Sequence, residues 1–278
     1  MTDKLMEKLD KIDLSDKTNR MALTAFAAYG ALYLGSWAWT VTKGFMKYCV
    51  LPRKNLKSRY GECWALVTGA SDGLGKSYAN ELAKSGIDVI LMARSQEKTQ
   101  KVADEIAKQH NVKTKVITYD FANLSSEESI NDLKALLEKE TEGLDVGILV
   151  NNVGCTKFGA FDTQTWEDHM RQVNVNINSQ TYMSLFLVPK MLERKSKSAI
   201  INVSSVAHFY PMGSLAMYCA TKSYNYVFSK NLALNYPKKI DVLTVTPAGT
   251  KTQMYSGRYS FSVSAEDHGK AVIDQLGW

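Results

Sequence analysis

Short, continuously apolar runs alternate with helix-patterned segments from residue 61 onward, and this alternation constrains the fold more than any other feature. Strands covered by helices on both faces read as unbroken runs of Val, Ile and Leu. Successive parallel strands also need a connection, usually a helix, that crosses back over the sheet. The pattern therefore predicts an α/β protein with a doubly wound parallel sheet. Strands are expected within residues 63–69, 88–94, 115–121, 145–154, 198–205 and 241–247, and helices within 76–85, 96–109, 125–140, 163–194 and 217–235.

Three segments of different character precede this region. Residues 1–20 mix acids and bases, residues 21–42 carry no charge, and residues 43–60 form a basic linker. As a helix, the uncharged segment can cross the roughly 30 Å hydrocarbon core of a bilayer, with Trp37 and Trp39 placed as interfacial anchors. It predicts a transmembrane or membrane-anchoring helix. A secretory signal peptide fits less well because the leader is not net positive, whereas the Thr, Ser and Gly content leaves a buried or interfacial helix open.

The formal net charge of +6 is concentrated in the linker, where six bases follow one another from Lys43 to Arg59 with no acid between them. A basic stretch beside an apolar segment indicates a membrane surface as partner, and no nucleic acid. The four cysteines have no paired spacing, which is typical of a reduced compartment. The four histidines are isolated, so no metal site is expected.

The first apolar run leads into a glycine-rich turn, TGASDGLG, at Thr68–Gly75. Gly69, Gly73 and Gly75 leave the backbone bare where the chain turns from a strand into a helix. Such a turn can bring the N–H groups of a helix N-terminus close to a pyrophosphate. Its position between an expected strand and an expected helix is the context that dinucleotide binding requires. The sequence predicts a Rossmann-type dinucleotide site at this turn.

The residues that follow the second and third apolar runs bear on which dinucleotide binds. An Asp or Glu after the second run commonly holds the ribose 2′-hydroxyl of NAD, and none is present. Arg94 stands there and can make charge-assisted hydrogen bonds to a 2′-phosphate, or it is simply a surface arginine at a strand end. NADPH or NADP⁺ is the expected cofactor. Asp120 is expected either to hydrogen-bond the adenine or to cap a turn.

Four motifs follow one another in a fixed order: TGASDGLG, then NNVG at Asn151–Gly154, then MYCATK at Met217–Lys222, and a late TP at Thr246–Pro247. Over residues 61–278 this order resembles the short-chain dehydrogenase/reductase family, which implies an NADP-binding domain with that fold.

The resemblance implies a catalytic set of four side chains. Tyr218 follows Ser205 by 13 positions and precedes Lys222 by four, which are the spacings of the family; the neighbouring Ser204 does not fit. Asn176 takes the fourth place, which it matches better than Asn174 does. In such a set the tyrosine donates a proton to a ketone oxygen, and the serine holds that oxygen. The lysine lowers the pKa of the phenol and binds the ribose, while the asparagine positions a water molecule.

The resemblance also implies which residues hold the cofactor. They lie on the glycine turn, after three of the strands and on the catalytic helix: Gly69, Ser71, Asp72, Gly73, Leu74, Gly75, Arg94, Asp120, Asn152, Tyr218, Lys222, Pro247 and Thr252. The family's Pro-Gly after the sixth strand reads Pro247-Ala248 here, from which a small adjustment of that loop is expected.

The wording TGASDGLGKSYA followed by DVGILVNNVG resembles a membrane-bound branch of the family. This branch holds very-long-chain 3-ketoacyl-CoA reductases and related 17β-hydroxysteroid dehydrogenases of type 12. It implies NADPH-dependent reduction of a lipid ketone, first of all a long-chain 3-ketoacyl-CoA, at the endoplasmic reticulum membrane with the catalytic domain facing the cytoplasm. A ketosteroid reductase and a nucleotide-binding membrane scaffold without turnover are the alternatives.

Three further expectations follow, two of them from the family as a whole. Its members often pair through their long helices, which allows a homodimer here and leaves the oligomeric state open. They also continue into a seventh strand and a further segment, so the C-terminus is expected to be incomplete, and the aromatic segment 252–264 is expected to line the substrate pocket.

Overall fold

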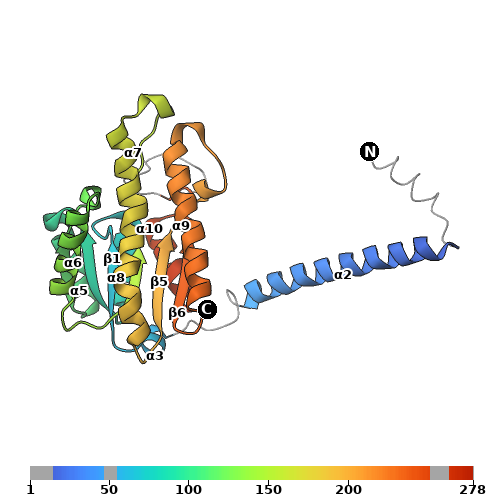
Figure 1. Cartoon of the computed structure of the whole chain (residues 1–278). Helices are drawn as coiled ribbons and strands as arrows, with labels where there is room; N and C mark the ends of the chain where they lie inside the picture. The colour runs from blue at the N-terminus through green and yellow to red at the C-terminus, as the bar shows by residue number, and fades with distance from the viewer. Residues whose placement is uncertain (1–14, 47–54, 251–262, 278) are drawn as a thin grey trace. The chain divides into compact units, whose positions relative to one another are not determined.

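The computed structural model of the protein describes residues 15–46, 55–250 and 263–277 (Figure 1). The chain divides into two compact units, Met1–Pro52 and Arg53–Trp278.

The described part of the first unit is helix α2 (Lys17–Phe45). Asp16 caps it, because its carboxylate accepts a hydrogen bond from the backbone N–H of Thr18 at 2.7 Å. The helix predicted at residues 21–42 is thus confirmed and extends further at both ends. Within the described ranges, however, no helix has the combination of length and hydropathy needed to cross a membrane. The expected membrane-spanning helix is therefore not borne out by hydropathy, which the Gly, Ser, Thr and Tyr residues of this segment lower.

The second unit is built on the predicted parallel sheet, and each strand overlaps one of the six predicted runs. In the described residues the strand order is β3-β2-β1-β4-β5-β6. The order reverses between β1 and β4, and ligands of open α/β sheets bind at the carboxyl ends of the strands at such a switch point. The strands are β1 (Trp64–Thr68), β2 (Asp88–Ala93), β3 (Thr114–Thr118), β4 (Val146–Asn151), β5 (Ser198–Val203) and β6 (Ile240–Val245).

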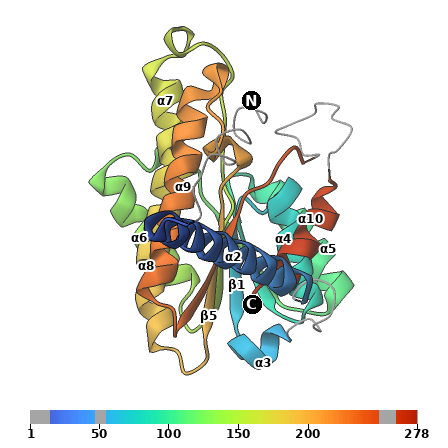
Figure 2. The same cartoon turned by 90° about the vertical axis from the view of Figure 1, so that its right-hand side faces the viewer.

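Helices cover both faces of the sheet, as the apolar strands predict (Figures 1 and 2). Apolar side chains of α4 (Gly73–Lys84), α5 (Gln96–His110) and α10 (Ala265–Asp274) pack on one face. Those of α6 (Glu127–Glu140), α8 (Ser179–Glu193) and α9 (Ala216–Asn235) pack on the other. The loops that follow β1, β4 and β5 lie at one end of the sheet and lead into α4, α7 (Trp166–Val173) and α9.

The last residues of the segment predicted as a basic linker are part of the folded unit. They form the short helix α3 (Leu56–Tyr60), in which Leu56 and Tyr60 are buried. The guanidinium of Arg59 makes two hydrogen bonds to the Asp241 carboxylate, at 2.5 and 2.9 Å, and the Tyr60 hydroxyl donates a third at 3.0 Å. These bonds tie α3 to β6 at the end of the sheet where β6 begins.

Candidate active site

Ser205, Tyr218 and Lys222 come together where β5 ends and α9 begins. Ser205 lies two residues past the end of β5, and its hydroxyl lies close enough to the Tyr218 phenol to lower the pKa of that group. The Lys222 Nζ lies 5.7 Å from the centroid of the Tyr218 ring and donates to the Val203 carbonyl at 3.0 Å. A phenol, a hydroxyl and an amine, each able to exchange a proton, therefore share one partly buried corner.

The two neighbouring serines have different contacts. The Ser204 hydroxyl donates to the Lys222 carbonyl oxygen at 2.6 Å and is buried against α9, so it holds the helix to the strand. The loop beyond Ser205 is fixed by a hydrogen bond from the Val206 N–H to the Pro247 carbonyl at 3.0 Å. The spacing argument that chose Ser205 over Ser204 agrees with this geometry, because Ser205 is the serine whose hydroxyl influences the phenol.

Burial determines the proton affinities in this corner. Burial raises the pKa of Tyr218, and the hydrogen bond from Ser205 offsets part of that rise. Burial also lowers the pKa of Lys222 to about 8, because a charged ammonium loses its hydration there. The expectation that Lys222 lowers the pKa of the phenol is therefore not met in this structure. The lysine points to a backbone carbonyl and is not among the groups that shift the pKa of Tyr218, and burial of the phenol outweighs the opposing effect of Ser205.

Asn176 lies where the predicted long helix over residues 163–194 is interrupted. A π-helical turn, Asn174–Asn178, separates α7 from α8 and turns the Asn176 side chain inward, 1% exposed. Its Oδ1 accepts from the Cys155 N–H at 2.8 Å, and its Nδ2 donates to the Cys155 carbonyl and to the Thr221 hydroxyl, both at 2.9 Å. The asparagine thus joins the loop after β4 to the catalytic helix.

Asn174, the rejected alternative, has a different environment. Its Nδ2 donates to the Ala122 carbonyl at 3.0 Å, in the short 3₁₀ helix η2 (Phe121–Asn123) after β3. It makes contacts outside the catalytic corner, which supports the choice of Asn176.

Two residues near the site carried no prediction. Gly154 leaves room for two functional groups, since a Cβ built there would lie 3.4 Å from the Lys222 Nζ and 3.5 Å from the Asn176 Oδ1. Thr221 accepts the hydrogen bond from Asn176 and donates to the Tyr218 carbonyl at 2.9 Å. In the sequence, Gly154 and Thr221 stood out only as members of the NNVG and MYCATK motifs. The sequence does not show which groups lie next to a glycine or a hydroxyl in the fold.

The glycine turn has the conformation that the sequence predicts. Gly69 and Gly73 have positive φ angles of 65° and 54°, where residues with a side chain are strained. A Cβ on Gly75 would overlap the Gly69 carbonyl oxygen, so the close contact between turn and helix needs glycine. Asp72 caps α4 by accepting a hydrogen bond from the Gly73 N–H at 2.7 Å. The first amides of an α-helix have no carbonyl partner within it and favour an anion. This turn therefore fits a pyrophosphate.

Asn152 locks the turn from the side of β4. Its Nδ2 donates to the Thr68 carbonyl at 3.0 Å and to the Gly69 carbonyl at 3.3 Å, and its N–H donates to the Thr68 hydroxyl at 3.0 Å. It was predicted to bind the cofactor, and the structure shows that it holds the backbone of the cofactor turn.

The other predicted cofactor residues are placed as follows. Arg94 directly follows β2 and is exposed, while Asp120 caps the 3₁₀ helix η2 by accepting from the Ala122 N–H at 3.0 Å. Asp120 thus has the capping role that the sequence left open. Ser71 and Leu74 lie on the turn and the first turn of α4, both partly buried. Thr252 and most of the segment 252–264 lie outside the described residues.

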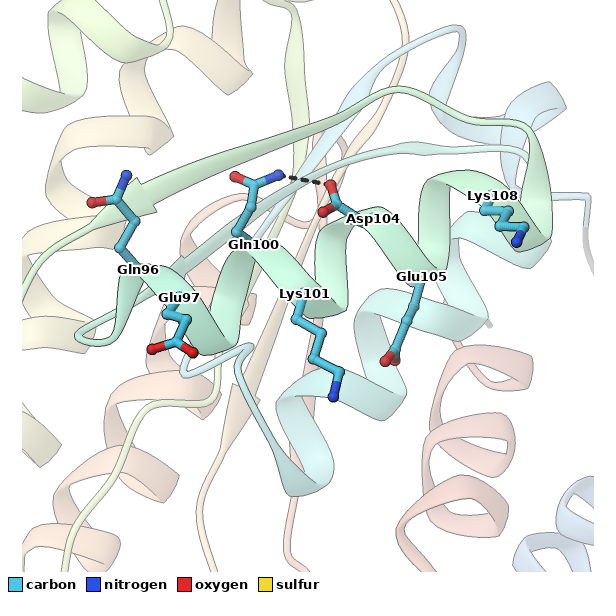
Figure 3. A pocket seen from close by; sticks show the side chains of 7 residues that line it. All are labelled: Gln96, Glu97, Gln100, Lys101, Asp104, Glu105 and Lys108. Atoms are coloured by element: carbon cyan, nitrogen blue, oxygen red, sulfur yellow. Dashed lines mark hydrogen bonds between the residues drawn. The ribbon is translucent and has the colours of Figure 1, made fainter.

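A surface depression lies away from these residues, along the outer face of α5 (Figure 3). All its lining side chains come from one helix and are exposed, with acids and bases interspersed, and Gln100 donates to Asp104 at 2.8 Å. This is the pattern of a solvated helix face, and it brings together none of the predicted site residues. The lining consists of Gln96, Glu97, Gln100, Lys101, Asp104, Glu105 and Lys108.

The sheet order, the glycine turn and the Ser–Tyr–Lys corner define a class of nucleotide-dependent oxidoreductases with a doubly wound α/β fold. The family model for short chain dehydrogenases matches residues 63–261. The chain therefore belongs to the short-chain dehydrogenase family.

Relatives within this family share a large part of the chain. A very-long-chain 3-oxoacyl-CoA reductase of Anas platyrhynchos is 43% identical over 223 residues, which cover 77% of this chain and 69% of the relative. The hydroxysteroid dehydrogenase-like protein 1 of Gallus gallus is 36% identical over 271 residues, covering 92% and 80%. Among solved structures, a short-chain dehydrogenase from Sphingobium yanoikuyae in complex with NADPH has a TM-score of 0.68 at 26% identity, covering 75% of this chain and 82% of that one.

Proposed function

We propose that this protein reduces a long-chain 3-oxoacyl-CoA to the 3-hydroxyacyl-CoA with NADPH. The observation that carries the reaction type is the placement of the Ser205 hydroxyl beside the Tyr218 phenol, whose pKa it lowers, with Lys222 buried near the Tyr218 ring. Relatives that are 33–43% identical and named very-long-chain 3-oxoacyl-CoA reductase support the substrate class. A ketosteroid is the second candidate substrate, because the relative aligned over 92% of the chain is named a hydroxysteroid dehydrogenase-like protein.

Ketone reduction needs a hydride, which NADPH supplies when bound, and a proton, which the chain supplies. Ser205 is placed to hydrogen-bond the ketone oxygen and to hold it beside Tyr218. Tyr218 then donates its proton to that oxygen, and its raised pKa keeps it protonated at neutral pH. Lys222 lies next in line to return a proton, because its lowered pKa of about 8 makes it a readier donor than an ordinary lysine. Asn176 fixes the Cys155 backbone and the Thr221 hydroxyl on either side of this route.

The choice of NADPH over NADH depends on Arg94. We expect Arg94→Ala to raise the KM for NADPH about 10- to 100-fold, because a charge-assisted hydrogen bond contributes roughly 1.5–3 kcal/mol. The KM for NADH should change little, since NADH has no 2′-phosphate. Lys108→Ala removes the same charge at the other end of α5 and should leave both values as they are. An equal loss for the two cofactors would show that Arg94 does not read the 2′-phosphate.

The substrate class is tested by following NADPH consumption by the purified chain with a long-chain 3-oxoacyl-CoA and, in parallel, with a ketosteroid. Turnover of the acyl-CoA, with the 3-hydroxyacyl-CoA identified as product, is the expected result. Preference for the steroid would keep the mechanism and replace the substrate. Binding of NADPH with no reduction of either ketone would favour the third alternative, a nucleotide-binding scaffold.

Helix α2 suggests where in the cell this reaction takes place. Its apolar side chains are exposed around the helix, with Phe26 78% and Leu32 74% exposed, and the basic segment at residues 43–60 follows it. Removing the apolar surface of such a helix from water lowers the free energy of the system. The proposal is association with the endoplasmic reticulum membrane, where a long acyl chain would partition. Cell fractionation of the full chain and of a chain that begins at residue 53 should find only the former with the membranes.

A further inference from the structure

A ring of buried polar side chains lies between the sheet and the two helices α8 and α9, which run side by side across one face of the sheet (Figures 1 and 2). Each member is at most 4% exposed, and most positions around it are apolar core. We call this set the polar ring; it consists of Asn151, Asn176, Gln180, Ser184, Asn202, Asn225 and Ser229.

Hydrogen bonds connect the ring across four elements. On the side of α8, the Ser184 hydroxyl donates to the Gln180 carbonyl at 2.7 Å and accepts from the Asn151 Nδ2 at 3.2 Å. The same Asn151 Nδ2 donates across the sheet to the Asn202 Oδ1 at 2.9 Å. On the side of α9, the Asn202 Nδ2 donates to the Ser229 hydroxyl at 3.1 Å.

The α9 side of the ring is also bonded to the π-helical turn that carries Asn176. Asn225, one turn before Ser229 on α9, donates from its Nδ2 to the Asn176 carbonyl oxygen at 2.7 Å. Gln180 precedes Ser184 by four residues on α8, as Asn225 precedes Ser229 on α9. Side chains four residues apart lie on the same face of an α-helix, so each of the two helices presents two ring members on one face.

Three polar atoms of the ring are buried without a hydrogen-bond partner among the described residues: the Asn151 Oδ1, the Gln180 Nε2 and the Asn225 Oδ1. Two of them are acceptors and one is a donor. A water molecule can donate two hydrogen bonds and accept one, which gives each of these three atoms a partner. Buried waters in proteins typically make about three such bonds to polar groups that would otherwise be unpaired.

We propose that the polar ring is a binding site for one internal water, which accepts from Gln180 and donates to Asn151 and Asn225. The water joins β4, α8 and α9 at one point. It also holds the Asn225 amide in the orientation that binds the Asn176 carbonyl, so it fixes the π-helical turn against the catalytic helix. The site is independent of the substrate, and its test does not require turnover.

The proposal predicts coupling between Gln180 and Asn225, between which the structure gives no hydrogen bond. Asn225→Leu and Gln180→Met each remove polar atoms at similar side-chain size and should each lower the urea midpoint of unfolding. In the double variant the loss should be smaller than the sum of the two single losses, because both remove bonds to the same water. Strictly additive losses would overturn the proposal.

A matched control separates this coupling from a general effect of buried amides. Gln172 on α7 is 1% exposed and also has an unpartnered Oε1, but it is not a member of the ring. Gln172→Met combined with Asn225→Leu should therefore give additive losses. A crystal structure should show a water within hydrogen-bond distance of the three unpaired atoms. Rotated amides that pair with one another, with no water between them, would equally overturn the site.

Discussion

Replacing Tyr218 by Phe should reduce ketone turnover about 10²- to 10⁴-fold, the range over which a positioned acid or base contributes to a rate. The substitution keeps the ring and removes only the hydroxyl, which lies beside Ser205. NADPH binding and the free energy of unfolding should therefore remain close to those of the wild type. The measurement is NADPH consumption with the preferred ketone, together with NADPH titration by fluorescence.

Tyr224→Phe is the matched control, because Tyr224 lies on the same helix and its hydroxyl bonds to Thr181 at 2.7 Å on α8. It should keep most of the activity. If Tyr218→Phe retained wild-type turnover, another group would have to donate the proton, and the assignment of Tyr218 would be wrong.

Replacing Lys222 by Met should abolish turnover and change how stability depends on pH. Burial lowers the pKa of Lys222 to about 8 in the folded protein, against 10.5 for an ordinary lysine. Between these two values the unfolded chain binds the proton more strongly than the folded one, so stability of the wild type rises with pH across this window. The contribution of this one group is roughly 3 kcal/mol. Below about pH 8, Lys222 is protonated in both states, and burying its charge lowers the unfolding free energy by the full amount.

The test compares urea unfolding of the wild type and of Lys222→Met, without cofactor, at several values between pH 7 and pH 10.5. As the pH rises, the unfolding free energy of the wild type should increase relative to that of Lys222→Met. Lys230→Met, at an exposed position of the same helix, should follow the wild type. A pH-independent difference for Lys222→Met would mean that Lys222 is not desolvated in the way the structure indicates.

The fold was open to prediction because its signals are local. Unbroken apolar runs mark strands covered on both faces, and each of the six predicted runs contains most of a strand of the sheet. The positive φ angles of Gly69 and Gly73 follow from a turn that only glycine adopts without strain. The spacing of Ser205, Tyr218 and Lys222 also sufficed to select the three residues that meet.

Other features depended on long-range packing. The sequence could not show that burial raises the pKa of Tyr218, because desolvation depends on which segments cover the group. It could not show that Asn152 holds the glycine turn, or that Asn225 reaches the Asn176 carbonyl across two helices. The absence of charge in residues 21–42 was visible in the sequence. It did not decide whether the helix reaches the hydropathy of a membrane span.

The sequence by itself determined the order of strands and helices, the glycine turn and which serine, tyrosine and lysine lie together. Each of these follows from residues that are close together in the chain or from fixed spacings along it. The tertiary structure alone decided the proton affinities of Tyr218 and Lys222, the inward turn of Asn176 and the polar ring behind it. These depend on burial and on hydrogen bonds between residues far apart in the sequence, such as the 2.9 Å bond between Asn151 and Asn202, which are 51 positions apart.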